Sequence, residues 1–496
     1  MIAECYAGRR RSLRDGLVAL FVFAVCWSPV AAQGLPDSVI RTLSRFNLNP
    51  DDISVEIRDL STGAVVLSHR SNVARNPAST MKLVTTYAAL NMLGPGYQWQ
   101  TDLYAGGEID IDGVLAGDLI LRGGGDPYFV DEEIWRLTRE LWRRGLRHID
   151  GDLVVDDSYF SVPEVDPGAF DNEPLRAYNV QPNALLANFK VVRFWFEPIE
   201  GSDQVRITSL PKMPNLKIVN ELRSAPGRCR GYLRGIEIDA AANANTIRFR
   251  GRFPARCERY SLARSLLQHD EYAFGLFLRH WRALGGTLAG GLRREAVDTA
   301  QEPLLTWRSR GFSELMRLIN KNSNNVMTRQ VFLTMGAERF GAPGSIAKAR
   351  EAVFDWAAEN GFDFPHLNID NGAGLSRGAR FSTGSMCTLL VHAWHSPLMP
   401  EFLASLSLSG IDGTFARRHK NNALTAQAHV KTGRLDHVTA VSGYLQSADG
   451  RRYALSIMHN ANDVHRGSGE AVQDAVLRWL YQYQPLPVVS GQESAT

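Results

Sequence analysis

The chain has 496 residues, of which 44% are hydrophobic and 22% charged, and its formal net charge is +3. A chain of this length buries more than one hydrophobic core, so two or three domains are expected. The small net charge, without a basic patch, argues against nucleic-acid binding. After Ala32 no apolar run approaches the ~18 residues of a membrane span, so the remaining chain associates with a membrane peripherally at most.

Residues 1–32 have the pattern of a secretory signal peptide. An apolar run from Leu17 to Trp27 follows a basic segment and precedes the small residues Val30-Ala31-Ala32. The run is too short for a comfortable membrane anchor, which favours removal after export. An uncleaved anchor is the alternative, and the adjacent Arg10 and Arg11 leave the twin-arginine export route open.

A hairpin and a helix are predicted next. Residues 53–57 alternate between apolar and polar side chains, a turn follows at 61–63, and residues 64–67 return as a second strand. The helix carries Ser79-Thr80-Met81-Lys82 near its start, has an apolar face, and stops at Gly94-Pro95.

The pair Ser79 and Lys82 is a candidate nucleophile with its base. Residues three apart project from the same side of a helix, so the Lys82 amine reaches the Ser79 hydroxyl. A serine hydroxyl is a poor nucleophile until a neighbouring group takes its proton. The helix N-terminus also favours the negative charge that develops during acyl transfer. By itself this pattern is better explained by a capping serine and a surface lysine.

Residues 98–267 are rich in glycine, aspartate and strand-forming residues, and a helix is predicted near Glu133 to Arg144. This segment contains Cys229 and Cys257, 28 positions apart, which either pair in an oxidising compartment or stay free. The acidic residues from Glu108 to Asp112 resemble the start of a calcium loop, but Leu119 stands where the closing glutamate is needed, so a β-turn is the better interpretation.

A second motif, Ser323-Asn324-Asn325, lies in a polar turn between two predicted helices. The first helix covers residues 312–319, with Ser313 as a possible cap, and the second begins near Val326. Such a turn brings a hydroxyl and an amide into a cleft, where Ser323 relays a proton and Asn325 holds a substrate amide. A solvated helix connection is the alternative.

The third motif, Lys431-Thr432-Gly433, begins a stretch of strands at 438–445 and 453–458. On an edge strand the lysine is a fixed cation, the threonine binds a substrate carboxylate, and the glycine lets a substrate backbone lie close. An amphipathic helix over residues 472–483 ends the chain, and we expect the hairpin, the final helix and these strands to build one sheet.

Several other short strings resemble functional motifs, but their sequence context supports them less well. Residues 374–378 match the G-x-S-x-G elbow but lie in a glycine-rich loop without the flanking strand and helix. Cys387 is expected to be a buried free thiol, and His459 and His465 to have ordinary surface or core roles. No Cys/His cluster supports a zinc site, so neither a metal nor a cofactor is expected.

Three motifs in this order resemble those of the class C low-molecular-mass penicillin-binding proteins, the D-alanyl-D-alanine carboxypeptidase/endopeptidase family. Further likeness lies in residues 117–127, 151–156, 370–377 and 410–414, so it covers nearly the whole chain after the signal. The resemblance implies an α/β (α+β) fold: a β-lactamase-like transpeptidase domain, an antiparallel sheet with flanking helices, carrying large β-rich inserted domains. The domains expected are a signal peptide (1–32), a discontinuous peptidase domain (33–97 and 268–486), an insertion of two nested subdomains (98–267), and a polar tail (487–496).

The resemblance also implies a mechanism and a location. Ser79 is acylated and deacylated, Lys82 is the base because the nearby cation Lys431 lowers its pKa, and Ser323 returns the proton. The backbone N–H groups of Ser79 and Arg434 stabilise the oxyanion. The substrates are peptidoglycan stem peptides and cross-links in the periplasm, and β-lactam antibiotics are covalent inhibitors.

Arg434 departs from the family pattern, because many relatives have serine or threonine after the Lys-Thr-Gly motif. Its guanidinium either takes over the contact with the substrate carboxylate or loosens recognition toward internal cross-links. A β-lactamase or esterase of the same fold, and a non-catalytic peptidoglycan-binding protein, remain alternative functions.

Overall fold

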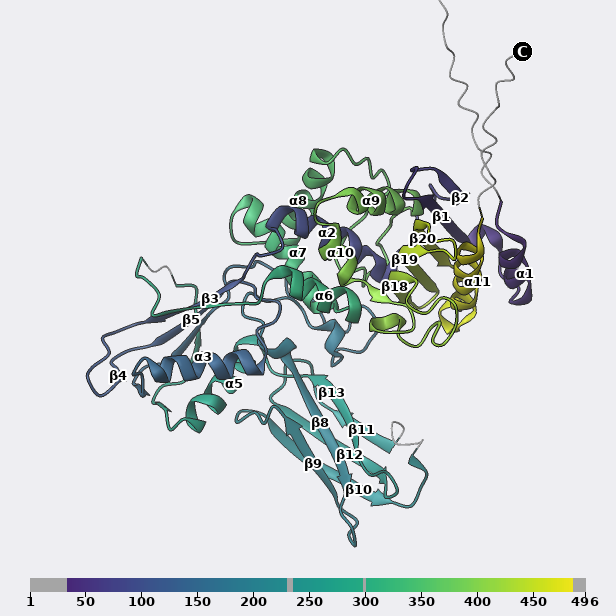
Figure 1. Ribbon diagram of the computed structural model, residues 1–496. Coiled ribbons are helices and arrows are strands. Elements are labelled where there is room, and N and C mark those ends of the chain that lie inside the picture. The colour runs from purple at the N-terminus through teal and green to yellow at the C-terminus, as the bar shows by residue number, and fades with distance from the viewer. Residues whose placement is uncertain (1–33, 230–234, 298–299, 485–496) are drawn as a thin grey trace, which may run out of the picture. The chain divides into compact units, whose positions relative to one another are not determined.

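The computed structural model describes residues 34–229, 235–297 and 300–484 (Figure 1). The predicted signal peptide and the polar tail lie outside these ranges. None of the described helices combines the length and the apolar character needed to cross a membrane.

A six-stranded antiparallel sheet joins the two ends of the described chain. Its strand order is β17-β18-β19-β20-β1-β2. The strands are β1 (Ile53–Asp59), β2 (Val65–His69), β17 (Ser407–Leu408), β18 (Ala428–Leu435), β19 (Val438–Gln446) and β20 (Arg452–Asn460). The predicted hairpin and the predicted C-terminal strands therefore form one sheet, as expected.

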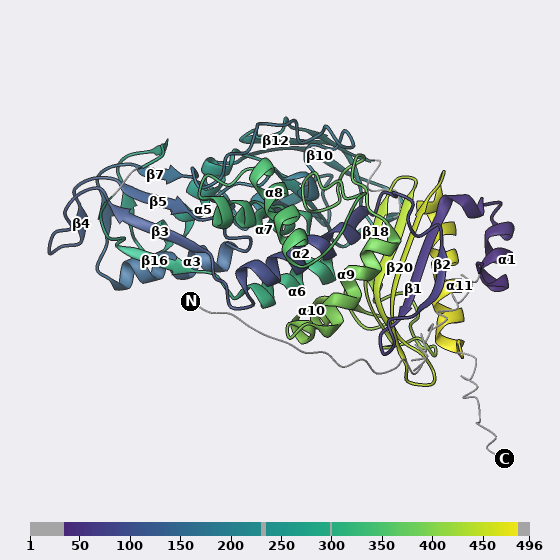
Figure 2. The same cartoon turned by 90° about the horizontal axis from the view of Figure 1, so that it is seen from above.

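Helices cover both faces of this sheet, which explains why its central strands β19 and β20 are buried along nearly their whole length. Because side chains alternate along a strand, Val441 and Leu445 of β19 pack on one face, and Ala440 and Tyr444 on the other. The first face is covered by α1 (Asp37–Arg45) and α11 (Ser468–Gln482). The helix α9 (Thr383–His395) covers the second, as Figure 2 shows.

The helix α2 (Met81–Leu93) lies inside a layer of other helices rather than on a surface. The predicted single apolar face is wrong in this respect, since even Thr85 and Thr86 are fully buried. Their hydroxyls are satisfied by the carbonyls of Gly372 and Lys82, at 2.6 and 2.7 Å. The surrounding helices include α6 (Phe312–Asn322), α7 (Asn325–Phe340), α8 (Ile346–Glu359) and α10 (Met399–Ser405).

The middle of the chain builds two further groups of strands. A five-stranded sheet has the order β15-β7-β5-β3-β16, and three strands in the order β14-β6-β4 form a smaller one. Their elements are β3 (Gln100–Ala105), β4 (Val114–Leu115), β5 (Leu119–Gly123), α3 (Asp131–Arg143), β6 (His148–Ile149), β7 (Leu153–Asp156), α5 (His269–Ala283), β14 (Thr287–Leu288), β15 (Leu292–Arg294) and β16 (Leu305–Arg308). The helix predicted near 133–144 is α3.

The second group consists of two three-stranded sheets, β13-β8-β9 and β10-β12-β11. Their facing aromatic side chains pack together, with the Phe249 ring 5.0 Å from that of Phe194 and 5.1 Å from that of Phe196. Cys229 and Cys257 form a disulfide here. The strands are β8 (Val191–Pro198), β9 (Val205–Leu210), β10 (Lys217–Ala225), β11 (Ile236–Asp239), β12 (Thr246–Pro254) and β13 (Tyr260–Ser265).

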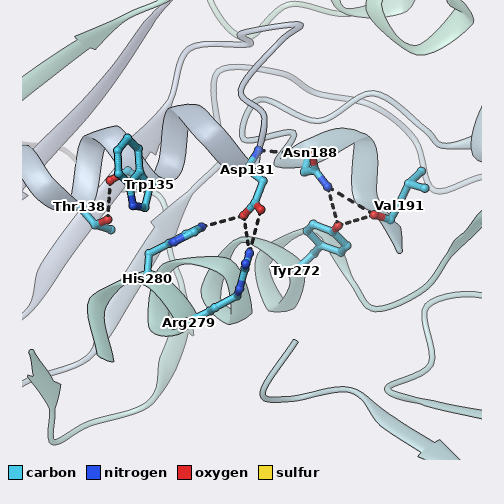
Figure 3. A network of polar contacts seen from close by, with 8 residues as sticks. All are labelled: Asp131, Trp135, Thr138, Asn188, Val191, Tyr272, Arg279 and His280. Carbon is cyan, nitrogen blue, oxygen red and sulfur yellow. Dashed lines mark hydrogen bonds and ion pairs between the residues drawn. The ribbon is translucent and has the colours of Figure 1, made fainter. Parts of the chain in front are cut away.

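The helix α5 is tied to the insertion by a polar network (Figure 3). Asp131, at the start of α3, accepts hydrogen bonds from Arg279, at 2.8 and 2.9 Å, and lies 2.7 Å from the His280 ring nitrogen. Tyr272 donates to the Val191 carbonyl at 2.6 Å. Burial opposes ionisation of Asp131, but the hydrogen bonds and charges of His280 and Arg279 hold the pKa of this carboxyl below its ordinary value.

The strands β15 and β16 indicate that the inserted region does not end at residue 267, where the sequence-based boundary lies. The strands β15 and β16 pair with β7 and β3 of the insertion, and Phe277 and Trp281 of α5 lie in the insertion's core. We therefore propose that the inserted region extends to about residue 308.

Candidate active site

Ser79 lies in a 3-10 turn (Ala78–Thr80) that leads directly into α2. The preceding residue, Ala78, has a left-handed backbone with φ of 45°, which is unfavourable for a residue with a Cβ. The side chain of Asn76 stabilises it by accepting the Ala78 N–H at 2.9 Å. Asn76 is itself held by Asn460, whose side chain accepts its N–H at 2.7 Å and donates to its carbonyl at 3.1 Å. The turn that presents Ser79 is thus fixed from β20.

The Lys82 amine is fully buried and has three partners. Its Nζ lies 3.0 Å from Ser79 Oγ, 2.6 Å from Asn325 Oδ1 and 2.6 Å from the Ala373 carbonyl. A neutral amine donates two hydrogens and keeps one lone pair. Because the amide and carbonyl oxygens can only accept, they take both hydrogens, and the lone pair is left for the Ser79 hydroxyl.

Burial, more than any neighbouring charge, lowers the pKa of Lys82 well below its ordinary value. Repulsion from Lys431 is the next cause, and repulsion from Arg329 is the third. The sequence-based prediction named Lys431 alone. It correctly gave the direction of the shift but missed the larger effect, which depends on how completely α2 is enclosed.

Ser323 lies in the turn between α6 and α7, as predicted, whereas Asn325 is the first residue of α7. Ser323 ends α6 in a left-handed conformation with φ of 55°, and Asn324 caps α7 by accepting the Met327 N–H at 3.1 Å. The expected cap at Ser313 is wrong, because Gly311 is the N-cap of α6 and no side chain caps it. The sharp reversal directs Asn325 to Lys82.

Lys431 is buried on β18, and its Nζ donates to Ser323 Oγ at 2.9 Å and to the Thr432 carbonyl at 2.8 Å. Burial lowers its pKa to about 7. The short strand β17 pairs only with His429 and Val430, so β18 has an open edge from Lys431 onward. The prediction of an edge strand therefore holds for the motif itself.

Gly433 allows β18 to pass very close to the turn that presents Ser79. A Cβ at this position would lie 2.7 Å from the Pro77 carbonyl oxygen and 3.0 Å from Ser79 N. Only glycine fits such an approach without movement of the strand. The next residue along β18, Arg434, thereby stands beside the Ser79 backbone.

A pocket of about 300 Å³ contains both Ser79 and Ser323. Arg434 lines it, is 59% exposed at its side chain, and has Nη1 3.6 Å from Glu470 Oε1 of α11. The hydroxyls of Thr432 and Thr414 lie 2.7 Å apart. The other lining residues are Arg418, Gly433, Thr439, Ala440 and Gln473.

Several residues of the site were not predicted as functional. Asn76 and Arg329 belong to no motif. Ala373 and Thr414 lie in the strings 370–377 and 410–414, which were noted only as family likeness. The sequence therefore contained a signal for Ala373 and Thr414. It did not show that Ala373 contributes its carbonyl and Thr414 its hydroxyl, because these contacts depend on the folded chain.

The competing strings have structural roles. Ser376 of the G-x-S-x-G string is bonded to Asp370, and its Oγ accepts the N–H groups of Gly378 and Ala379 at 3.0 and 3.1 Å. The acidic segment at 108–113 is a turn in which Asp110 accepts two backbone N–H groups. Cys387 is buried and free, as expected.

His465 has an ordinary structural role, as expected, although its imidazole has partners. His465 is not isolated, because its Nδ1 accepts the His437 N–H at 2.8 Å, and His437 Nδ1 accepts the Asp463 N–H at 3.1 Å. Ligand atoms of these three residues lie within 4.8 Å of one another. Since both Nδ1 lone pairs already accept backbone N–H groups, the geometry favours a loop-stabilising role for the pair.

Comparisons with known proteins agree with one another. The D-Ala-D-Ala carboxypeptidase 3 (S13) family matches residues 38–483. The D-alanyl-D-alanine carboxypeptidase of Actinomadura sp. (strain R39) is 30% identical over 443 residues, which are 86% of this chain and 81% of the relative. The D-alanyl-D-alanine carboxypeptidase DacB of Haemophilus influenzae is 23% identical over 432 residues, 84% of this chain and 89% of the relative.

The fold is likewise similar to a solved structure. The crystal structure of penicillin binding protein 4 (dacB) from Haemophilus influenzae has a TM-score of 0.78 at 22% identity, and the match covers 90% of this chain and all of that one. The same protein complexed with a novel beta-lactam has a TM-score of 0.73 at 21% identity. The expected fold, a penicillin-binding transpeptidase-like domain with extra domains, is thereby confirmed.

Proposed function

The chain belongs to the D-Ala-D-Ala carboxypeptidase 3 (S13) family and is a serine-type D-alanyl-D-alanine carboxypeptidase, and we propose that Ser79 is its nucleophile. The single observation that carries this assignment is the 3.0 Å contact between Ser79 Oγ and the buried Lys82 amine. The comparisons do not favour the β-lactamase, esterase or non-catalytic alternatives.

In the acylation step, Ser79 Oγ attacks the carbonyl carbon of the penultimate D-alanine while Lys82 Nζ takes the hydroxyl proton. The lowered pKa of Lys82 supports this role, because the neutral amine is the form that accepts a proton. The backbone N–H groups of Ser79 and Arg434 stabilise the oxyanion of the tetrahedral intermediate. The close passage of Gly433 past Ser79 N supports that pairing.

When the intermediate collapses, the C–N bond breaks and the departing amine gains a proton through Ser323. Its hydroxyl is fixed by Lys431, which is in turn the cation that attracts the substrate's carboxylate. Water then hydrolyses the ester on Ser79 and restores the hydroxyl. Asn325 both orients Lys82 and is positioned to hold the substrate's amide.

Thr432 and Arg434 bind the leaving group. The open edge of β18 lets the stem peptide add as a further strand, and the Arg434 guanidinium takes the place of the hydroxyl that follows this motif in many relatives. We infer that the enzyme also cleaves cross-links as an endopeptidase, since the Arg434 side chain that lines the pocket is itself 59% exposed. Release of D-alanine from a pentapeptide, compared with cleavage of cross-linked dimers, measures the balance.

The proposed location is the periplasm. The pattern of residues 1–32 and the disulfide between Cys229 and Cys257 support export, because such bonds persist in oxidising compartments. Peptidoglycan and β-lactam antibiotics are the partners proposed there.

A labelled penicillin tests the nucleophile. Mass spectrometry of the digested protein should find the label on the peptide that contains Ser79, and Ser79→Ala should remain unlabelled. The exposed Ser44 of α1 offers a control, since Ser44→Ala should react like the original protein. Labelling of Ser79→Ala, or of another residue, would overturn the assignment.

A further inference from the structure

A second pocket, of about 580 Å³, lies along α3 and shares no lining residue with the pocket around Ser79. Three tryptophans and three arginines dominate its walls. They are Trp135, Trp142, Trp307, Arg136, Arg139 and Arg143. No step of the proposed reaction uses any of them.

Helix spacing explains how the tryptophans and arginines come together. Trp135, Arg139 and Trp142 follow one another at intervals of four and three residues, so they occupy one flank of α3. Trp307 approaches from β16, the edge strand of the five-stranded sheet. Figure 3 shows Trp135 one turn along α3 from Asp131, the residue that ties this helix to α5.

Trp142 and Trp307 are partly buried and pack against the insertion's core, whereas Trp135 is exposed, and arginines lie against the rings on the pocket side. The Arg139 guanidinium is 5.0 Å from the Trp135 ring, and that of Arg136 is 5.3 Å from the Trp307 ring. Trp135 is 46% exposed. A guanidinium stacked on a ring still presents its N–H groups at its rim, and all of them are donors.

The charge of the pocket is only partly balanced. Glu133 pairs with Arg136 at 3.2 Å, and Glu140 pairs with Arg143 at 2.7 Å. Within the described part of the chain, Arg139 forms no ion pair. The pocket therefore combines flat apolar rings with unoccupied hydrogen-bond donors, a composition enriched at binding sites.

We propose that this pocket binds the glycan strand of peptidoglycan. The apolar face of a pyranose ring stacks on an indole, while its hydroxyl and acetamido oxygens accept hydrogen bonds from guanidinium groups. The choice of polymer rests on the proposed function, which places the enzyme on peptidoglycan. The pocket would hold the polymer while Ser79 acts on its peptides.

A membrane surface suits the pocket less well. The apolar residues of α3, such as Ile134, Leu137 and Leu141, are buried in the core and are not free to enter a bilayer. Only Trp135 presents a large exposed apolar surface on this helix.

The test measures binding to insoluble purified peptidoglycan by co-sedimentation. The double variant Trp135→Ala/Arg139→Ala should bind at least about tenfold more weakly, as expected when an aromatic anchor and its arginine are removed. The chain offers a matched control in Arg45, whose guanidinium lies 5.6 Å from the ring of the exposed Phe46. The double variant Arg45→Ala/Phe46→Ala should bind like the original protein.

Further measurements distinguish a failure of this pocket proposal from a failure of the proposed function. Both double variants should keep the kcat/KM of the original protein on a soluble pentapeptide. If the original protein itself does not hydrolyse this pentapeptide, the result counts against the proposed function and not against this pocket. Glycan strands freed of stem peptides should still be bound. Equal sedimentation of the two double variants, loss of binding to stripped glycan, or stronger binding to anionic phospholipid vesicles would each overturn the proposal.

Discussion

Arg434 of β18 faces Glu470 of α11 across the pocket that holds Ser79, with 3.6 Å between the guanidinium nitrogen and the carboxylate oxygen. The carboxylate competes with any anionic group that a substrate brings to Arg434. The ion pair is partly exposed, so it is weak enough to exchange.

Glu470→Gln is therefore expected to improve hydrolysis of a pentapeptide with a free terminal carboxylate. An exposed ion pair contributes up to ~1 kcal/mol, so kcat/KM should rise by about two- to fivefold. Arg434→Ala should lower the same quantity. Glu401→Gln, at an exposed position of α10, serves as the control. An unchanged rate in Glu470→Gln would contradict the competition.

The low pKa of Lys431, about 7, predicts a decline in substrate acylation at alkaline pH. A lysine is charged below its pKa, so the cation that attracts the carboxylate disappears as the pH rises through about 7. Lys431→Arg keeps a charge throughout, and its profile should lack this decline. Stopped-flow acylation between pH 5 and 10 measures both profiles. A decline that survives in Lys431→Arg would assign it to another group.

The acidic limb of the pH profile of penicillin acylation should shift when Arg329 is replaced by methionine. Its charge is one cause of the lowered pKa of Lys82, so Arg329→Met should raise that pKa. The rising limb of penicillin acylation would then shift to higher pH, because the neutral amine forms later. Arg329→Lys keeps the charge and should leave the limb in place. An identical shift in both variants would mean that packing, not charge, matters at this position.

Gly433→Ala tests the contact between β18 and the turn that presents Ser79. The added Cβ would lie 2.7 Å from the Pro77 carbonyl, so the strand must move away from Ser79. A displacement of about 1 Å costs on the order of 100-fold in rate, which the acylation rate with penicillin measures. Gly291→Ala, just before β15, controls for a general effect of the change, because an added Cβ would meet no atom within 4 Å there. An acylation rate within a few-fold of the original would show that the strand adapts.

The disulfide between Cys229 and Cys257 should stabilise the insertion. Closing a loop over a separation of 28 residues contributes about 3 to 4 kcal/mol in the chain-entropy description. The double variant to serine should therefore lower the thermal midpoint of unfolding, and a reducing agent should do the same only in the original protein. Penicillin acylation of Ser79 at low temperature should persist, because the disulfide lies outside the pocket.

Much of the site could be predicted because it uses local rules. The spacing of Ser79 and Lys82 on a helix start, the polar turn at Ser323, and the strand character after Lys431 are properties of neighbouring residues. The hairpin, the final helix and the free Cys387 were predicted for the same reason. The boundary of the insertion was harder to place, because the pairing of β15 and β16 with distant strands has no local signature.

By itself, the sequence determined the reaction type, since three short motifs in a characteristic order indicate a serine-type D-alanyl-D-alanine carboxypeptidase, with Ser79 as the proposed nucleophile and Lys82 as its proposed base. Only the tertiary structure decided how these groups are tuned. Burial, which is a property of the whole fold, lowers the pKa of Lys82 more than the charge of Lys431 does. Long-range contacts such as Lys82 with Ala373, Asn76 with Asn460, and Arg434 with Glu470 join segments far apart in the chain, and no spacing rule along the sequence specifies them.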